Sequence, residues 1–174
     1  MLKQASVSDL VSDRVSRETS YIVITMRRYP RFVNRLLRDE YLTCMSPDWP
    51  LFEDWLAAKR KFNDHDGAFA KAKFEERFDV NDEGLEHLAR LCAMAADRDV
   101  YLVCQCHTGH RCHREFLLIM AKRLFKANVE KPRNAYPIFE KRMPDFRRRL
   151  KQKLKFAKER SAPVASEVSV TKTQ

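Results

Sequence analysis

The chain lacks an uninterrupted apolar stretch of about 18 residues, the length that a membrane-spanning helix needs. Its first residues, Met1 to Arg17, are polar and mixed in charge, without the apolar core of a signal peptide. It has five cysteines, and an odd count argues against the disulfide framework of a small secreted protein. We therefore expect a cytoplasmic protein without a membrane span, in which the thiols stay reduced.

The positive charge is concentrated near the C-terminus. The 174 residues carry a net charge of +10, and the segment from Lys141 to Arg160 has ten basic residues against two acidic ones. That segment accounts for +8 and leaves only +2 for the rest of the chain. With 44% hydrophobic residues, the length suits one domain with a substantial core. We divide the chain into a leader (1–19), a domain (20–140), a basic helical arm (141–160) and a disordered tail (161–174).

Hydrophobic patterns predict two strands and several helices, including one from Leu51 onward, where Leu51, Phe52, Trp55, Leu56 and Phe62 fit a helical spacing. Runs of β-branched and apolar residues mark buried strands at 20–26 and 100–104. Apolar residues at helical spacing predict helices over 82–96 and 113–125, and a basic helix over 143–160. The helix–strand–helix succession predicts an α/β fold, with one small domain whose parallel-type sheet is flanked by helices and followed by the basic helix. Two strands do not settle the strand order.

Three of the five cysteines and three of the five histidines lie within the ten residues from Cys104 to His113. The cluster joins the end of the second predicted strand to the start of a predicted helix. Loops at this position of α/β folds bind ligands and carry catalytic groups. The cluster therefore locates a candidate site, and four interpretations of it stay open.

The first interpretation is a metal site. Cys104, Cys106, Cys112 and His113 form the pattern C-x-C-x5-C-H, a soft ligand set that suits zinc or another transition metal. Cys104 and Cys106 are two residues apart, so on a strand they face the same way. Against a metal site, the first spacing is shorter than the usual C-x2-4-C of structural zinc.

The second interpretation is thiol catalysis. Cys112 lies where a helix begins and is followed by His113 and Arg114; the helix dipole and a nearby cation both stabilise a thiolate. Cys104 or Cys112 would be the nucleophile, His113 a proton carrier and Arg114 an anion binder. The C-x5-R loop of ordinary phosphatases is excluded, because Cys106 and Arg111 are separated by four residues only.

Two further interpretations need no catalysis. Cys104 and Cys112 would form a reversible disulfide if the intervening loop folds back, which spacing alone does not decide. Cys104 on a buried strand would equally serve as an ordinary small apolar residue. Outside the cluster, His65 stands between Asp64 and Asp66. A carboxylate-supported histidine is one interpretation there, and we favour a solvated loop.

The sequence resembles the domain of unknown function family 488, in a short bacterial branch. Leu102-Val103-Cys104 followed after a loop by Cys112-His113-Arg114 matches that family's strand–loop–helix signature, and Arg27, Pro30 and Arg31 resemble its N-terminal R-x-x-P-R element. The resemblance covers roughly residues 20–125. It implies a small α/β fold and a site formed by Cys104, Cys112, His113, Arg114, Arg27 and Arg31, the two latter as anion-binding residues.

The chain departs from the family pattern at two positions. Thr25 replaces the usual aspartate, and Cys106 stands where a glutamate is common, which strengthens the metal and redox interpretations for this chain. The resemblance implies no known reaction, and the basic arm is not part of the shared pattern.

The basic arm suits a polyanionic partner. Lysines and arginines at this density bind nucleic acid mainly through its phosphates. We expect the contact to be made by Arg147, Arg148, Arg149, Lys151 and Lys155. An anionic membrane surface and a simple solvated helix are the alternatives. Two hypotheses follow for the whole chain: a thiol-dependent enzyme acting on a phosphate-bearing or nucleic-acid substrate, or a metal-binding or redox-sensing nucleic-acid-binding protein without catalysis.

Overall fold

The computed structural model describes residues 1–161, with backbone only for Leu154 and residues 156–161. The chain divides into two compact units, Met1–Met143 and the segment from Pro144 onward, and each is described by itself. The tail predicted over 161–174 lies outside the described residues, apart from Ser161. In the described part of the chain, no helix has both the length and the hydropathy to cross a membrane.

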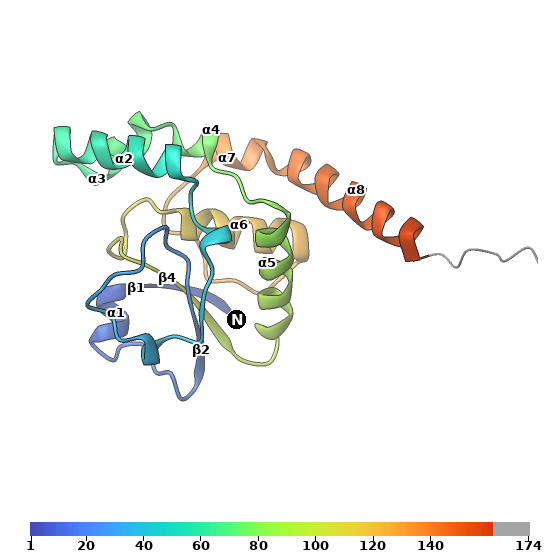
Figure 1. The fold of residues 1–174 in the computed structure, drawn as a ribbon, viewed down its shortest axis with the longest axis horizontal. Helices are drawn as coiled ribbons and strands as arrows, with labels where there is room; N and C mark the ends of the chain where they lie inside the picture. The colour runs from blue at the N-terminus through green and yellow to red at the C-terminus, as the bar shows by residue number, and fades with distance from the viewer. Residues whose placement is uncertain (162–174) are drawn as a thin grey trace, which may run out of the picture. The chain divides into compact units, whose positions relative to one another are not determined.

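The first unit is built on a parallel sheet of four strands in the order β1-β4-β2-β3 (Figure 1). The strands are β1 (Leu2–Ser6), β2 (Ser20–Ile24), β3 (Glu40–Tyr41) and β4 (Asp99–Cys104). β4, the last strand in sequence, lies between β1 and β2 and pairs with both along its length. The predicted α/β fold with a parallel sheet is confirmed.

Helices and short helical turns connect the strands or follow the last one. The helices of the first unit are α1 (Val7–Val11), α2 (Trp49–Phe62), α3 (His65–Lys71), α4 (Phe74–Arg77), α5 (Asp82–Met94), α6 (His113–Phe125) and α7 (Pro137–Lys141), and two 3-10 turns are η1 (Arg35–Leu37) and η2 (Thr43–Met45). The helices predicted over 82–96 and 113–125 therefore form with nearly the predicted bounds. The basic helix is α8 (Met143–Ser161), close to the predicted 143–160.

Both faces of the sheet are covered by apolar side chains, as a parallel sheet requires. On one face, Ile22, Ile24 and Val103 pack in a cluster with Val7 and Leu10 of α1. α6 packs against β1 and β4, and α5 packs against α6 (Figure 1). The near-continuous apolar runs that predicted β2 and β4 arise from this burial on both faces.

The N-terminal segment differs from its prediction. Residues 1–19 were assigned to a leader ahead of the domain, whereas Leu2–Ser6 forms β1 and pairs with Val100–Cys104. The segment Leu2-Lys3-Gln4-Ala5-Ser6 contains three polar residues, and two of them have partners far along the chain: the Lys3 ammonium donates to Asp99 at 2.6 Å and the Gln4 amide donates to Glu115 at 3.2 Å. Polar residues in a strand hide it from a hydrophobicity pattern.

Leu2 should be a major contributor to the stability of the domain. Its side chain is fully buried, so Leu2→Ala is expected to lower the free energy of unfolding by about 2–5 kcal/mol, which urea denaturation measures. Val11→Ala is the control, since Val11 is 51% exposed and its loss should change the free energy by less than about 0.5 kcal/mol. Equal effects of the two changes would contradict the placement of β1.

Candidate functional site

A cavity of about 430 Å³ opens where the strands of the parallel sheet end. The carboxyl ends of parallel strands meet at one edge, and β4 delivers Cys104 there while β2 is followed by Thr25. Three groups of side chains line this cavity. The thiols are Cys104, Cys106 and Cys112; the basic side chains include Arg27, Arg28, Arg111 and His65; and the aromatic rings include Phe52, Trp55 and Phe69.

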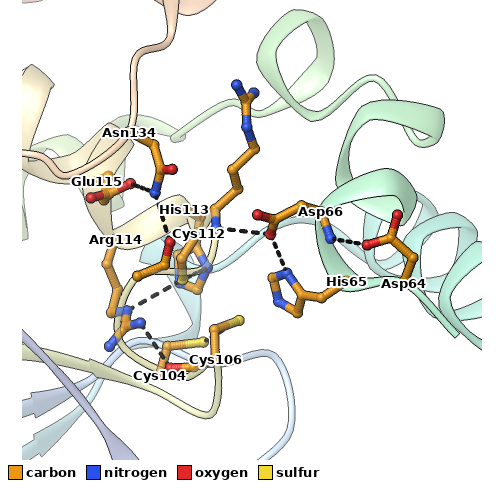
Figure 2. A network of polar contacts seen from close by, with 12 residues as sticks. Asp64, His65, Asp66, Cys104, Cys106, Cys112, His113, Arg114, Glu115 and Asn134 are labelled. Carbon is orange, nitrogen blue, oxygen red and sulfur yellow. Dashed lines mark hydrogen bonds and ion pairs between the residues drawn. The ribbon is translucent and has the colours of Figure 1, made fainter.

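The three predicted cysteines converge. The sulfurs of Cys104 and Cys106 are 3.7 Å apart, and those of Cys104, Cys106 and Cys112 all lie within 4.8 Å of one another (Figure 2). Cys104 and Cys112 are buried, and Cys106 is partly exposed. The loop over residues 105–111 thus folds back, which the spacing of the cysteines alone did not decide.

His113 stands in the first turn of α6, directly after Cys112, the N-cap residue of that helix. Its Nε2 lies 2.6 Å from the carbonyl oxygen of Thr25, so this nitrogen donates its proton to the carbonyl. Its Nδ1 then faces the Cys112 sulfur at 3.6 Å. The backbone after β2 therefore orients the imidazole toward the thiol.

Arg114 is almost completely buried, with 1% of its surface exposed. Its Nε donates to the Cys112 sulfur at 3.2 Å, and its terminal nitrogens donate to the carbonyl oxygens of Cys106, at 2.9 Å, and of Ala5 (Figure 2). A buried guanidinium needs a nearby negative charge to offset its desolvation. The Cys112 sulfur is the group in contact that can provide this charge.

The surroundings favour the thiolate of Cys112. Burial alone would raise the pKa of this thiol, but hydrogen bonds from Cys104 and Cys106 and the charges of Arg114 and His113 outweigh burial and hold it well below its usual range. For Cys106, hydrogen bonding to Cys104 and Cys112 raises the pKa well above its usual range. The cluster therefore holds one preferred anion, on Cys112.

The partner of that anion is the His113 imidazolium. Burial alone would lower the pKa of His113, but the neighbouring thiols, above all the negative charge at Cys112, raise it to about 10. An imidazole that keeps its proton at neutral pH and a thiol that has lost its own form an ion pair inside the protein. This pair is the chemical centre of the site.

Glu115 is a buried carboxylate that holds residues next to Cys112 in place, and the sequence analysis did not identify it. Glu115 accepts hydrogen bonds from the Tyr136 hydroxyl at 2.5 Å and from the Asn134 amide at 2.9 Å. The Tyr136 oxygen in turn accepts the backbone N–H of Cys112 at 3.1 Å, and burial together with Glu115 raises the pKa of this phenol. The signal in the sequence was an acidic residue on an otherwise apolar helix face, next to Cys112-His113-Arg114.

The expectation of a solvated loop at His65 is wrong. His65 begins α3 and is only 10% exposed, because it packs edge-on against Trp55 and faces the cysteine side of the cavity. Its Nδ1 bonds Asp66 at 2.8 Å, while Asp64 caps the helix by accepting the N–H of Asp66 (Figure 2). Burial lowers the pKa of His65, with the Asp66 hydrogen bond acting in the opposite direction. The alternative of a carboxylate-supported histidine is thus the observed one.

The two arginines of the R-x-x-P-R element differ in position. Arg27 lies on the cavity wall, where its Nε donates to the carbonyl oxygen of Pro47 at 2.7 Å. Arg31 is exposed and is not among the residues that line this cavity. An anion-binding role therefore has geometric support for Arg27, and for Arg31 it stays a prediction.

The basic residues of the arm lie on α8. Arg147, Arg148 and Lys151 are exposed, as is Lys155, and Arg149 is half-buried with its guanidinium over the Phe146 ring. Arg148 pairs with Asp145 at 2.8 Å, one turn away. Binding of nucleic acid by this helix stays a prediction.

A family model described as the active DUF488-N3 subclade, DUF488-N3a, matches residues 5–124. This match covers more than half of the chain, including strands β2, β3 and β4 and the whole cysteine cluster. The chain belongs to this family. No curated protein and no solved structure matches it significantly.

Membership in DUF488-N3a confirms the resemblance seen in the sequence. The structure places both positions at which we expect a departure from the family pattern. Thr25 contributes its carbonyl oxygen to His113, and its hydroxyl lies 3.4 Å from the same Nε2. Cys106 brings a third sulfur to the cluster.

The pKa of His113 should depend on the Cys112 sulfur. Because its pKa is raised from 6.5 to about 10, its contribution to stability is complete below pH 6.5 and is lost as the pH rises through about 10. Cys112→Ser removes the negative charge, so NMR titration of the ring nitrogens should give a pKa below that value. Cys92→Ser, on α5 away from the cavity, should leave it unchanged, and an unchanged value in Cys112→Ser would contradict the ion pair.

Proposed function

We propose that this DUF488-N3a protein is a cysteine-dependent enzyme whose nucleophile is the thiolate of Cys112 and whose substrate carries phosphate or another anionic group. One observation carries the proposal. The Cys112 sulfur lies on the wall of a 430 Å³ cavity, at the start of a helix, 3.2 Å from the Nε of the buried Arg114. This is the electropositive environment in which catalytic cysteines occur.

The chemistry follows from the ion pair. The thiolate of Cys112 uses an electron pair to form a bond to an electrophilic centre of the substrate, and the leaving group departs with the electrons of the broken bond. His113 holds the proton that Cys112 has given up and can donate it to that leaving group. Arg114 stays behind the sulfur and acts as a positioning residue for the thiolate.

The walls of the cavity fit an anionic substrate with a planar part. Arg27, Arg28 and Arg111 bring three positive charges to its lining. The indole nitrogen of Trp55 is buried there and, within the described residues, has no hydrogen-bond partner, so it is available as a donor to a ligand. These features support a phosphate-bearing or nucleotide-like substrate.

The thiolate can be tested without the substrate. At pH 7, iodoacetamide should modify Cys112 faster than any other cysteine, as followed by mass spectrometry of peptides. The rate should stay nearly constant between about pH 6 and 8, whereas the rate of an ordinary thiol rises about tenfold per pH unit below its pKa. The sign follows from the lowered pKa of Cys112, because a thiol that ionises at lower pH loses the pH dependence that an ordinary thiol shows near neutrality.

Two variants show which cysteine reacts. Cys112→Ser should remove the fast modification by iodoacetamide, and Cys92→Ser should retain it. Inorganic phosphate should slow the modification if the cavity binds anions; Arg27→Gln should abolish this protection, and Arg31→Gln should retain it because Arg31 does not line the cavity. A fast phase that survives Cys112→Ser, or a rate that rises tenfold per pH unit, would contradict the proposed nucleophile.

A metal site is the second candidate function, and one distance favours it. Zinc–sulfur bonds of about 2.3 Å in tetrahedral geometry place two sulfurs about 3.8 Å apart, close to the 3.7 Å between Cys104 and Cys106. Cys104, Cys106 and Cys112 could thus hold an ion, with Arg114 offsetting the excess negative charge. Near-stoichiometric zinc in protein purified without a histidine tag, lost in Cys112→Ser, would favour this function over the enzyme.

We also propose that α8 binds nucleic acid, since its exposed basic side chains suit the phosphate backbone. The combined change of Arg147, Arg148 and Lys151 to Gln should weaken binding to duplex DNA or RNA at low salt. It should also reduce the slope of log K against log salt by about 1 for each phosphate contact that is removed.

The matched control changes three exposed basic residues of the first unit, Arg60, Lys61 and Lys122, to Gln. The net charge falls by the same amount in both variants, so a general charge effect would weaken binding equally. Equal loss in the two variants, or no loss in the α8 variant, would show that α8 is not the contact.

A further inference from the structure

A second cluster of side chains lies beside the cysteine cavity and is not used in the proposed reaction. It borders a second cavity of about 430 Å³, which shares His65 and His107 with the cysteine cavity and is also lined by Asp66 and His110. One ring nitrogen of His65, one ring nitrogen of His110 and a carboxylate oxygen of Asp66 lie within 4.8 Å of one another. The imidazole rings of His65 and His110 are 4.5 Å apart, centre to centre.

We propose that His65 and His110 bind a divalent transition-metal ion, with Asp66 as the carboxylate that orients His65. The site is distinct from the three cysteines and does not depend on the proposed function. Imidazole nitrogens with a carboxylate nearby suit zinc, nickel or copper, rather than magnesium or calcium.

The state of His65 is the independent observation that points to a ligand. Its Nδ1 is 2.8 Å from Asp66, so the proton lies on this nitrogen and the lone pair lies on Nε2. That Nε2 is buried and has no hydrogen-bond partner in the described part of the chain, on a side chain that is nine-tenths buried. A histidine that donates one nitrogen to a carboxylate and offers the other has the form found in metal sites.

The carboxylate is itself held in place. The Asp66 oxygen that faces His65 also accepts the backbone N–H of Arg111 at 3.0 Å, and the backbone N–H of Asp66 donates to Asp64 at 3.1 Å. Asp66 is therefore fixed by two segments of the chain, and it fixes the ring of His65. An oriented ring binds a metal without the entropy cost of ordering it.

The remaining ligands lie on a more adaptable segment. His110 is exposed and lies in the loop between β4 and α6, and His107 of the same loop has its ring centre 6.0 Å from that of His110. An exposed histidine on a loop can move to close the distance to about 2.0–2.1 Å from a zinc ion. A bound metal would thereby tie α3 to the loop that carries Cys106, at the edge of the cysteine cavity.

The test is zinc binding to the full chain with Cys104, Cys106 and Cys112 all changed to Ser, measured by calorimetry. We expect one zinc ion bound with a dissociation constant in the micromolar range or below. His65→Ala and His110→Ala should each abolish binding in this background. Asp66→Asn should weaken it about 10- to 100-fold, the range for groups that orient a metal ligand.

His87→Ala is the matched control, because His87 lies on α5 in another group, with Cys44 and Glu83. Binding should be unchanged in it. No binding in the triple-serine background, binding that survives His65→Ala, or binding lost in His87→Ala would each overturn the proposal.

A second measurement applies if the triple-serine protein does not fold. Cobalt(II) added to the unchanged chain reports its ligands by absorption, since only thiolate ligands add sulfur-to-metal charge-transfer bands. A spectrum with d–d bands that His65→Ala removes supports the site. A spectrum whose d–d bands are unchanged by His65→Ala overturns it.

Discussion

The contact between the Arg114 guanidinium and the Cys112 sulfur is the constraint on which the rest of the site depends. A guanidinium with 1% of its surface exposed is stable only with its charge balanced and its N–H groups bonded. Here one bond goes to sulfur and two go to the carbonyl oxygens of Ala5 and Cys106. The same side chain thus joins β1, the cysteine loop and α6.

This arrangement explains why the three sulfurs converge. The bond from Arg114 to the carbonyl of Cys106 holds the loop against α6, and the bond to Cys112 orients its thiol toward the same space. His113, held by the carbonyl after β2, adds a second positive charge near the sulfur. Backbone carbonyls therefore place both cations, and hydrogen bonds from the two other thiols together with these cations favour ionisation of Cys112.

The ends of the parallel strands form the floor of the cavity, and side chains of α2 and α3 form part of its wall. β4 lies in the sheet between two strands of earlier sequence, so its carboxyl end faces a crevice bordered by the segments that follow β1 and β2. α2 and α3 bring aromatic and histidine side chains, including Trp55 and His65, over this crevice. The DUF488-N3a match over residues 5–124 includes β2, β3, β4 and the cysteine loop, which together form most of this floor.

The amino-acid sequence was enough to predict the α/β class, strand β4 and helix α6, because those segments bury apolar residues at the period of their own structure, and its cluster of cysteines and histidines located the candidate site. It did not determine β1, whose polar side chains find partners far along the chain, nor the burial of His65, which depends on packing against Trp55. The preference for a thiolate at Cys112 was also decided by tertiary structure. A pKa depends on charges and burial within a few ångströms, and those distances exist only once the chain has folded.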